Sequence, residues 1–394
     1  MHAVGIICEY NPLHHGHALH IARARAESGA DYVICAMSGP FTQRGAPARH
    51  DKWTRAQAAL AAGADLVLEL PVRFACASAQ EFAAGGVSLL ASLGVVTHLS
   101  FGCEEEALPL LSRAAQALGE ESPAFTSALR EGLDAGMSYP RARAAAILRE
   151  QPELEAALSL PNAALALEYL QAMPQGMIPV PVAREGSGYH DEALTALPSA
   201  TAVRSALERG DMDAALSSMP SAALFAAAEA RGDICEEEAL SQALIARLRT
   251  MDASDLAQIA GMDEGLEHRF LAAAQRCATR KKLIESVKTR RYTWARLSRL
   301  CTLSLLGVTR GMTQAHPAAE YARILGFRKS AAPLLREIRE RASIPVITKA
   351  ADFDQRHPLY ALDARAQDLW SLGCTSPDHR AGGRDFTTSP IIVD

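Results

Sequence analysis

The sequence predicts an α/β fold, in which a doubly wound parallel sheet is followed by a mainly α-helical domain. Two observations carry this prediction. Through residues 1–204, short apolar runs typical of buried strands alternate with stretches of helical periodicity. After residue 205, such apolar runs become rare and helical patterns dominate. We therefore expect two domains, residues 1–204 and residues 205–394.

Composition restricts the class of protein. The chain has 394 residues, which is long enough for two domains and a substantial core. Its formal net charge is −5, so any nucleic-acid binding must depend on a local basic patch. The eight cysteines include no CxxC pair, so neither a zinc site nor a disulfide framework is indicated. We expect a cytoplasmic protein, because no apolar stretch is long enough to span a membrane and no signal segment is recognisable.

The first strand and the start of the first helix form the most informative junction. Residues 3–8 are an apolar strand, Asn11-Pro12 breaks it, and His14-His15-Gly16-His17 opens a helical pattern. Free N–H groups at such a helix start attract anions, and glycine allows a phosphate to approach the backbone. The imidazoles can stabilise charge as a pyrophosphate leaves. The alternative is a loop that merely contains three histidines.

The second strand, residues 31–37, is followed by an unusually long loop rich in glycine and proline, residues 38–48. Three cations near it could face an anionic ligand: Arg44, Lys52 and Arg55. The alternative is a solvated basic helix start. Because cations oppose the dipole at the beginning of a helix, we favour a functional role for Arg44 and Lys52.

The remaining elements of the first half continue the alternation. We expect a third strand within residues 63–71, a helix over 75–93 and a fourth strand over 97–104 that contains Gly102. Helical patterns fill residues 108–158, and Asn162, a cap or a base-contacting amide, begins another helix. A fifth strand over 177–182 precedes a helix that starts with Ser199-Ala200-Thr201-Ala202-Val203-Arg204.

Two of these motifs resemble the phosphate-binding signatures of the nucleotidyltransferase superfamily. The first is His-x-Gly-His after a strand, at His14 to His17, and the second is Ser-x-Thr-x-x-Arg at a later helix start, at Ser199 to Arg204. They occur in the expected order. The resemblance implies that His14 and His17 contact ATP phosphates, and we expect Thr201 and Arg204 to do so from the other side of the cleft.

Further motifs resemble one family, the bacterial tRNA(Met) cytidine acetate ligases, over nearly the whole chain. They include Gly5 to His17, Met37-Ser38-Gly39, Gln43-Arg44-Gly45, Lys52-Trp53, Glu69-Leu70-Pro71, Phe101-Gly102, Pro161-Asn162, Tyr189-His190-Asp191, Gly265 to Arg269, Thr289 to Trp294 and Arg323 to Gly326. Membership implies that ATP and acetate form acetyl-adenylate, and that the wobble cytidine of elongator tRNA(Met) then becomes N4-acetylcytidine. Residues 1–204 would be the ATP-binding catalytic domain and residues 205–394 the tRNA-binding domain.

The resemblance also implies the site residues. The expected catalytic residues are His14, His17, Lys52 and Arg204. The expected ATP-binding residues are Ile7, Cys8, Glu9, Tyr10, Asn11, Pro12, Leu13, His14, His15, Gly16, His17, Ala18, Leu19, His20, Gly102, Asn162, Arg184, Glu185 and Thr201. The family usually has Phe at position 13, Asn at 15 and often Val at 8, and we expect these departures to be tolerated. Mg²⁺ is expected with ATP, without predicted protein ligands.

The second half carries a basic stretch, residues 276–299, interleaved with Tyr292 and Trp294. Such a mixture suits a phosphate backbone and exposed bases, although a solvated helix face with core aromatics is the alternative. The expected tRNA-binding residues are Lys281, Lys282, Arg290 and Arg291. Short apolar runs at 345–348 and 390–393 suggest a small strand pair.

Two other functions compete with the ligase. One is a small-molecule nucleotidyltransferase that makes a nucleotide cofactor, which would explain both signatures but not the helical half. The other is a non-enzymatic RNA-binding protein that senses ATP.

Overall fold

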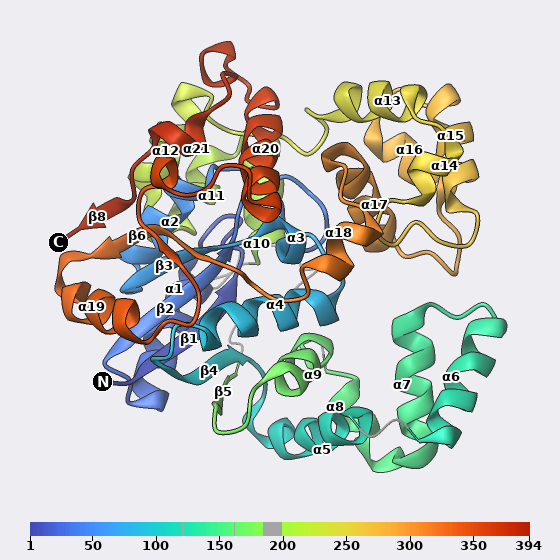
Figure 1. Ribbon diagram of the computed structural model, residues 1–394, viewed down its shortest axis with the longest axis horizontal. Coiled ribbons are helices and arrows are strands. Elements are labelled where there is room, and N and C mark those ends of the chain that lie inside the picture. Colours follow the sequence, from blue (N-terminus) through green and yellow to red (C-terminus); the bar gives the residue numbers. More distant parts are fainter. Residues whose placement is uncertain (120–121, 161, 184–198) are drawn as a thin grey trace.

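A central sheet organises the molecule. The computed structural model describes residues 1–119, 122–160, 162–183 and 199–394 (Figure 1). Five parallel strands lie in the order β5-β4-β1-β2-β3. Their bounds are β1 Ala3–Cys8, β2 Tyr32–Ser38, β3 Leu66–Leu70, β4 Val96–Gly102 and β5 Ile178–Val182. The order places β1 at the centre, so the loop that follows it lies in the middle of the carboxyl edge, where ligands bind such sheets.

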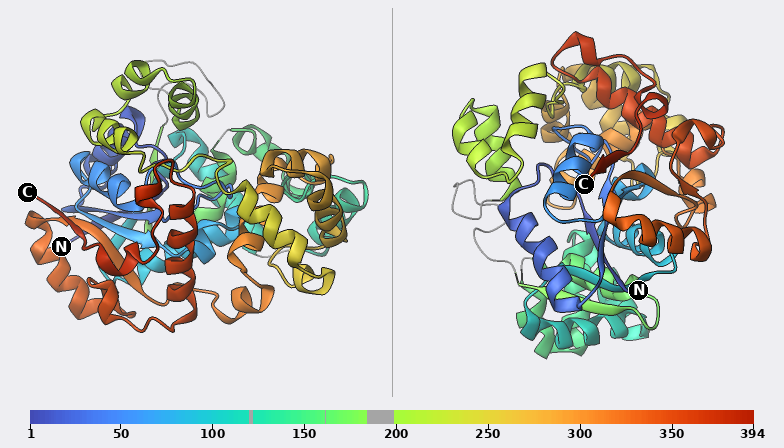
Figure 2. Two further views of the ribbon diagram at one scale, coloured as in Figure 1. Left: turned by 90° about the horizontal axis from the view of Figure 1, so that it is seen from above. Right: turned by 90° about the vertical axis from the view of Figure 1, so that its left-hand side faces the viewer.

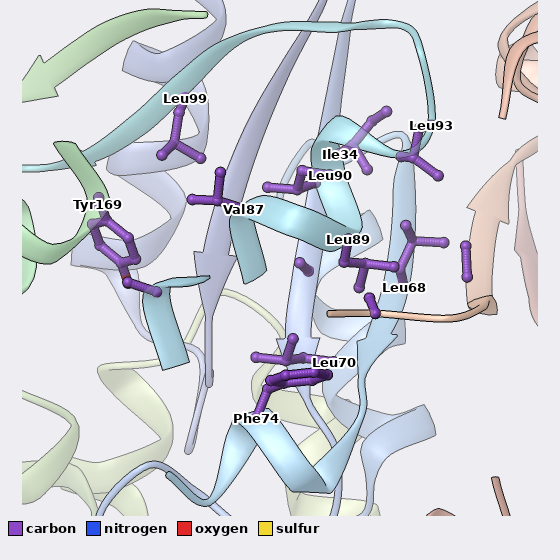
Figure 3. Close-up of a cluster of buried hydrophobic side chains, with 14 of the residues drawn as sticks. Ile34, Leu68, Leu70, Phe74, Val87, Leu89, Leu90, Leu93, Leu99 and Tyr169 are labelled. Carbon is purple, nitrogen blue, oxygen red and sulfur yellow. The ribbon is translucent and has the colours of Figure 1, made fainter. Parts of the chain in front are cut away.

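Helices cover both faces of the sheet, which confirms the doubly wound arrangement. On one face α4 (Ala79–Ala91) packs on the strands, and Figure 3 shows its Val87, Leu89 and Leu90 gathered with Leu68 of β3. On the other face lie α1 (His15–Ser28) and α2 (Lys52–Ala61). The three leucines are fully buried, and each such side chain contributes about 1.5–3 kcal/mol of stability.

A helical arm is inserted between β4 and β5. It consists of α5 Leu108–Gly119, α6 Pro123–Asp134, α7 Tyr139–Glu150, α8 Glu155–Leu158 and α9 Ala163–Ala172. The helical pattern predicted for residues 108–158 is therefore confirmed in the described ranges. Phe125, Ile147 and Leu154 form part of a small core within the arm. The last helix of the arm, α9, packs against the sheet domain, since its Tyr169 belongs to the same buried cluster as the core side chains of α4 (Figure 3).

The helix that contains residue 204 and the two helices after it pack against the first-half sheet. They are α10 Ala200–Glu208, α11 Met212–Ser217 and α12 Ala222–Arg231. Val203, Leu207 and Phe225 share one buried cluster with α1 and α2. No change of core therefore marks residue 204, and the division at that point remains a prediction about function.

A separate group of helices follows, which we call the helical lobe. It comprises α13 Ser241–Thr250, α14 Ala253–Ala257, α15 Leu266–Arg276, α16 Arg280–Val287, α17 Trp294–Leu306 and α18 Arg310–Ala315. The lobe has its own buried cluster, which extends to Phe41 of the loop after β2 and to Trp370. Figures 1 and 2 show the lobe on the side of the molecule away from both chain termini.

The C-terminal segment returns to the sheet. Strand β6 (Ala322–Arg328) pairs antiparallel with β3, and β7 (Val346–Ile347) and β8 (Ile391–Val393) both pair parallel with β6. The predicted pairing of the last two apolar runs with each other is wrong, because each instead pairs with a different part of β6. Three helices complete the segment: α19 Ala332–Arg341, α20 Pro358–Leu372 and α21 Arg384–Thr387.

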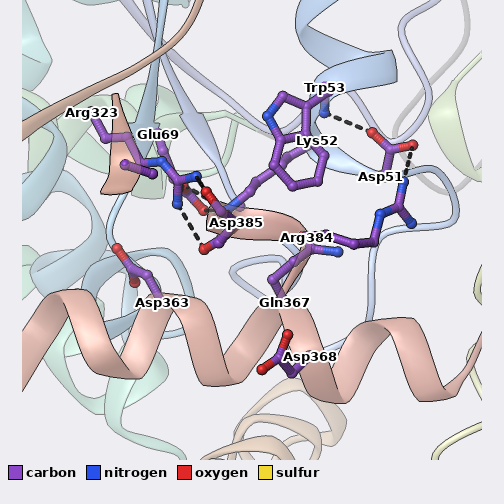
Figure 4. Close-up of polar contacts among 12 residues, drawn as sticks. Asp51, Lys52, Trp53, Glu69, Arg323, Asp363, Gln367, Asp368, Arg384 and Asp385 are labelled. Carbon is purple, nitrogen blue, oxygen red and sulfur yellow. Dashed lines mark hydrogen bonds and ion pairs between the residues drawn. The ribbon is translucent and has the colours of Figure 1, made fainter. Parts of the chain in front are cut away.

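A buried charge network joins this segment to the first half (Figure 4). Lys52 Nζ lies 2.8 Å from both carboxylate oxygens of Glu69 and 2.7 Å from the Asp385 carboxylate. Arg323 Nη1 lies 2.7 Å from Asp385 Oδ2 and 3.1 Å from Glu69 Oε2. All four side chains are at least 96% buried. Two cations balance two anions, so the network satisfies charges that would be prohibitively costly alone.

Asp363 of α20 lies beside this network. Its carboxyl accepts hydrogen bonds from the Val72 N–H, at 2.8 Å, and from the Tyr321 hydroxyl. Burial, together with the neighbouring Glu69 carboxylate, raises the pKa of Asp363 to about 8. Asp363 is therefore largely protonated at neutral pH. At Asp385 burial also favours the neutral acid, but the cations Lys52 and Arg323 outweigh it and hold the pKa of Asp385 below its ordinary value.

No helix in the part of the chain that the structure describes is long and apolar enough to cross a membrane.

Candidate active site

A cavity of about 570 Å³ opens at the carboxyl ends of β1, β4 and β5. Thirteen of the predicted site residues line it: Ile7, Cys8, Glu9, Tyr10, Asn11, His14, Gly16, His17, Leu19, His20, Gly102, Asn162 and Arg204. They come from four separate stretches of the chain, which the parallel sheet brings to one edge. The volume lies within the ordinary range for a site that binds a nucleotide-sized ligand.

His14 and His17 form the start of α1. His14 is the N-cap, and its Nδ1 accepts a hydrogen bond from the Gly16 N–H at 3.1 Å. His17 Nδ1 accepts in return from the His14 N–H at 3.4 Å. The two rings are stacked with their centroids 3.7 Å apart. This is the reciprocal pattern of a capping box, made here by imidazoles.

The capping pattern determines what these imidazoles present to the cavity. Because each Nδ1 accepts a backbone proton, the neutral ring carries its own proton on Nε2. Two Nε2–H donors, from His14 and His17, therefore lie at the N-terminus of α1, where the helix dipole adds positive potential. This arrangement favours an anionic group such as a phosphate without requiring either histidine to be charged.

Two neighbouring elements complete this wall. His20, one turn further along α1, has its Nε2 3.0 Å from Ser100 Oγ of β4. Burial lowers the pKa of His20 to about 4, so the ring is neutral at physiological pH. Gly102 ends β4, and a Cβ there would lie 3.6 Å from the Asn162 amide nitrogen. A larger side chain at position 102 would therefore enter the cavity.

Arg204 brings a cation to the cavity wall. Its Nη1 donates to the Asn11 carbonyl at 2.6 Å, and its Nη2 contacts Thr201 Oγ1 at 3.3 Å. Ser199 caps the same helix, α10, by accepting from the Ala202 N–H at 3.0 Å. Thr201 does not line the cavity but contacts Arg204 from behind, so its predicted direct contact with a ligand is not supported.

The loop after β2 contributes Gln43 and Arg44 to the cavity wall. A functional role was expected from the sequence for Arg44, but not for Gln43. The Gln43 N–H donates to the Glu9 carboxylate at 2.6 Å. Burial raises the pKa of Glu9, although the Gln43 N–H and the cations Arg204 and Arg44 act in the opposite direction. Among the described residues, the cavity wall thus combines the Glu9 carboxylate with the guanidinium groups of Arg44 and Arg204, a charge balance suited to a polyanionic ligand.

Comparison with known proteins agrees with this geometry. The family model described as HIGH nucleotidyl transferase matches residues 1–385. A tRNA(Met) cytidine acetate ligase of Acetivibrio thermocellus is 36% identical over 418 residues, with both chains fully covered. The ligase of Geobacillus sp. is also 36% identical, again with full coverage of both chains. The chain belongs to the tRNA(Met) cytidine acetate ligase family.

A solved structure of this ligase family has the same fold. The crystal structure of Thermotoga maritima TmcAL bound with alpha-thio ATP matches with a TM-score of 0.92, at 31% identity and with complete coverage of both chains. The predicted doubly wound α/β fold class is therefore confirmed by both the sheet topology and this likeness.

Not every position implied by the ligase family's signature faces the cavity. Residues 7–20 were predicted as a continuous binding segment, but four of its members lie elsewhere: Pro12, Leu13, His15 and Ala18. Leu13 is fully buried in the core below α1. His15 is exposed, with its ring 3.2 Å from the Ser217 carbonyl. A helix turns its side chains through 100° per residue, so a continuous segment cannot face one ligand. Arg184 and Glu185 lie outside the described residues.

The prediction that Lys52 acts at the active site is wrong for this structure. Its side chain is fully buried in the charge network with Glu69 and Asp385 and does not line the cavity. Arg55 is likewise fully buried and does not face a ligand. Its guanidinium donates to the carbonyls of Glu9, Ser38, Gly39 and His50. Arg55 therefore holds the ends of β1 and β2 together beneath the cavity.

Aromatic side chains of the cavity wall were also missed. Phe82 of α4, Phe101 of β4 and Tyr169 of α9 line it. The only sequence signal was the Phe101-Gly102 pair at a strand end. The other two belong to ordinary helical patterns, in which an aromatic residue facing a ligand cannot be distinguished from one facing a core.

The predicted tRNA-binding residues lie on the helical lobe, away from the cavity. Lys281, Lys282 and Arg290 are exposed, and Arg291 pairs with Glu264 at 2.5 Å. The two interleaved aromatics differ. Tyr292 is buried and its hydroxyl donates to Glu264 at 3.0 Å, whereas the Trp294 side chain is 37% exposed at the start of α17. Of the two, Trp294 is the aromatic available to stack on a base.

Within residues 1–119, 122–160, 162–183 and 199–394, no group of three or more His, Cys, Asp or Glu side chains is arranged to hold a metal ion.

Proposed function

We propose that this protein is an ATP-dependent ligase that acetylates elongator tRNA(Met), converting its wobble cytidine to N4-acetylcytidine. One observation supports this most: the capped His14–His17 pair and Arg204 line one cavity in a chain related over its full length to curated tRNA(Met) cytidine acetate ligases. The solved relative from Thermotoga maritima is described as bound with alpha-thio ATP. We accordingly place ATP in the cavity and expect the enzyme to work in the cytoplasm.

The proposed reaction has two steps. A carboxylate oxygen of acetate attacks the α-phosphorus of ATP, the bond to the β-phosphate bridging oxygen breaks, and pyrophosphate leaves with acetyl-adenylate formed. The N4 amine of the cytidine then attacks the acetyl carbon, AMP leaves, and the nitrogen loses a proton. Charge that develops on the departing pyrophosphate needs positioned donors, which is the largest contribution a protein usually makes to such a step.

The cavity residues have distinct proposed roles. The Nε2–H groups of His14 and His17 donate to phosphate oxygens at the start of α1. Arg204, held by the Asn11 carbonyl, also binds a phosphate group. Glu9 is the carboxylate among the described cavity-lining residues and would hold a Mg²⁺ that arrives with ATP. That ion would neutralise charge on the phosphate oxygens.

The test is to follow labelled acetate. Incubation with ATP and elongator tRNA(Met) should transfer label to the tRNA, and N4-acetylcytidine should be found after nuclease digestion. Acetate-dependent exchange of labelled pyrophosphate into ATP should occur without tRNA. Adenylyl transfer to a small nucleotide substrate in place of acetate would favour a cofactor-making nucleotidyltransferase. ATP and tRNA binding without either reaction would favour a non-enzymatic RNA-binding protein.

We predict that Arg204→Ala lowers kcat/KM for ATP in the exchange reaction by about ten- to a hundredfold, the scale of a lost hydrogen bond from a charged group. The matched control is Arg209→Ala, because Arg209 ends the same helix but is exposed and does not line the cavity. An ATP-bound structure in which Arg204 turns toward the helical lobe would contradict this prediction.

We predict that replacing Lys281, Lys282, Arg290 and Arg291 by Ala weakens tRNA binding and flattens its salt dependence by about one unit of slope for each lost phosphate contact. The exchange reaction without tRNA should be unchanged, because these residues do not line the cavity. A matched control removes the same charge from α19 and its start, by changing Lys329, Arg336, Arg339 and Arg341, which are exposed and far from the lobe (Figure 1). Unchanged tRNA affinity in the lobe variant would place the binding surface elsewhere.

A further inference from the structure

The loop after β2 connects the cavity to the helical lobe. Residues 42–46 form a tight turn, in which the Gly45 N–H donates to the Thr42 carbonyl at 2.8 Å and the Thr42 N–H donates to the Ala46 carbonyl at 2.9 Å. On one side of this turn Gln43 and Arg44 line the cavity. On the other side the turn rests on α16 and α17 of the lobe.

The lobe holds two successive carbonyls of the turn. Ser298 Oγ donates to the Arg44 carbonyl at 2.5 Å, and Thr302 Oγ1 donates to the Gly45 carbonyl at 2.5 Å. Arg280 donates to the same Gly45 carbonyl at 3.0 Å and also to Ser298 Oγ. All three donor side chains are buried, so the carbonyls they satisfy cannot turn to water instead.

The approach between turn and lobe leaves no space. Gly45 has φ of +77°, a left-handed conformation that favours glycine. A Cβ at this position would lie 2.6 Å from both the nitrogen and the Cα of Arg299 in α17. The turn is thus pressed against the backbone of α17 and held there by side-chain hydrogen bonds.

The cavity side of the turn is held as closely. The Gln43 N–H donates to the Glu9 carboxylate at 2.6 Å, and the Gln43 side-chain amide donates to the Ala77 carbonyl at 3.0 Å. Glu9 follows β1 and lies in the cavity wall. A shift of the turn would therefore move both the hydrogen-bond partner of Glu9 and the attachment point of the Arg44 guanidinium.

We propose that Thr302, with Ser298 and Arg280, is a positioning residue through which the helical lobe places Gln43 and Arg44 in the ATP site. This inference rests on the proposed function, since it assigns ATP to the cavity. Adenylation then depends on a part of the chain that contributes no atom to the cavity wall, because Thr302 acts only through the backbone it holds. The helical lobe consequently contributes to acetyl-adenylate formation, in addition to its proposed role in tRNA binding.

The experiment compares Thr302→Val, which keeps the shape but removes the donor, with Thr302→Ser, which keeps the hydroxyl. The matched control is Ser304→Ala, because Ser304 is buried in the same helix and its Oγ has no hydrogen-bond partner among the described residues. Each full-length variant is assayed for ATP affinity by calorimetry, for acetate-dependent pyrophosphate exchange without tRNA, for tRNA affinity and for melting temperature.

We expect Thr302→Val to weaken ATP binding or lower kcat/KM for ATP by about tenfold, the scale of one lost buried hydrogen bond, since Arg280 still donates to the Gly45 carbonyl. Thr302→Ser and Ser304→Ala should match the wild type, and tRNA affinity should be unchanged throughout. Ser298→Ala should act in the same direction as Thr302→Val and replaces it if the valine variant does not fold.

Wild-type values for both Thr302→Val and Ser298→Ala would overturn the inference, as would a loss that Thr302→Ser fails to rescue. Failure of the proposed function is distinguishable, because the wild-type protein itself would then show no acetate-dependent exchange.

Discussion

His17→Ala is expected to slow acetyl-adenylate formation by about a hundredfold or more. The reason is that the His17 ring carries a donor at the start of α1, where charge on the leaving pyrophosphate must be stabilised, and one such donor typically contributes a factor of this size. The measurement is the initial rate of acetate-dependent pyrophosphate exchange at saturating ATP. Binding of ATP should be affected less than the rate.

His14 requires a different substitution, because the structure gives it a second role. Sequence reasoning predicts that His14→Ala leaves the melting temperature nearly unchanged. As the N-cap of α1, however, His14 contributes about 1 kcal/mol to stability, so His14→Ala should also lower the melting temperature. Asn caps helices well, so His14→Asn should keep the stability and lose only the catalytic donor.

His15 is the matched control for both histidines. It lies between them in sequence but is exposed, contacts the Ser217 carbonyl and does not line the cavity. His15→Asn should therefore exchange pyrophosphate at the wild-type rate. Wild-type exchange in the double variant His14→Asn/His17→Ala would show that neither histidine takes part in adenylation.

Asp385→Asn is expected to destabilise the protein by about 3–5 kcal/mol, the cost of removing one partner from a buried ion pair, because Glu69 alone would then face two buried cations. Lys52 and Arg323 would both face an amide in place of a carboxylate, in a site closed to water (Figure 4). The measurement is the free energy of unfolding from urea denaturation at pH 7. Because α21 and β6 are joined to α2 through this network, docking of the C-terminal segment should loosen first.

The same substitution at Asp363 provides the matched control. The pKa of Asp363 is about 8, so Asp363→Asn replaces a largely neutral acid by a neutral amide and should cost far less at pH 7. An equal loss of stability in the two variants would contradict the assigned charges.

The pH dependence gives a second check on Asp385. Its pKa is held below the ordinary value, so its carboxylate contributes stability above the ordinary pKa, and this contribution is lost as the pH falls through the lowered pKa. The difference in unfolding free energy between the wild type and Asp385→Asn should therefore shrink in acid. If this difference in unfolding free energy stays constant from pH 7 to pH 3, the negative charge of Asp385 does not stabilise the protein.

The sequence by itself determined the features that depend on neighbouring residues. The first strand is found at residues 3–8 as predicted, and the helix that opens at the His14-His15-Gly16-His17 motif begins at His15. Apolar runs and capping residues specify such elements locally, whatever the rest of the chain does. Because parallel strands bring their carboxyl ends to one edge, the alternation of strands and helices predicted where a site would lie. The resemblance to the ligase family supplied the individual residues, of which His14, Gly102 and Arg204 line one cavity.

Only the tertiary structure decided the roles of the isolated charges. Lys52 and Arg55 stand beside each other on α2 in a basic, polar segment, and sequence context cannot tell a cation that faces a ligand from one that is buried. Lys52 is neutralised by Glu69 and by Asp385, 333 positions further along the chain, while Arg55 donates to backbone carbonyls. A charge can be buried only where partners from distant elements surround it, and those partners meet only when the sheet closes with β6 and α21 in place.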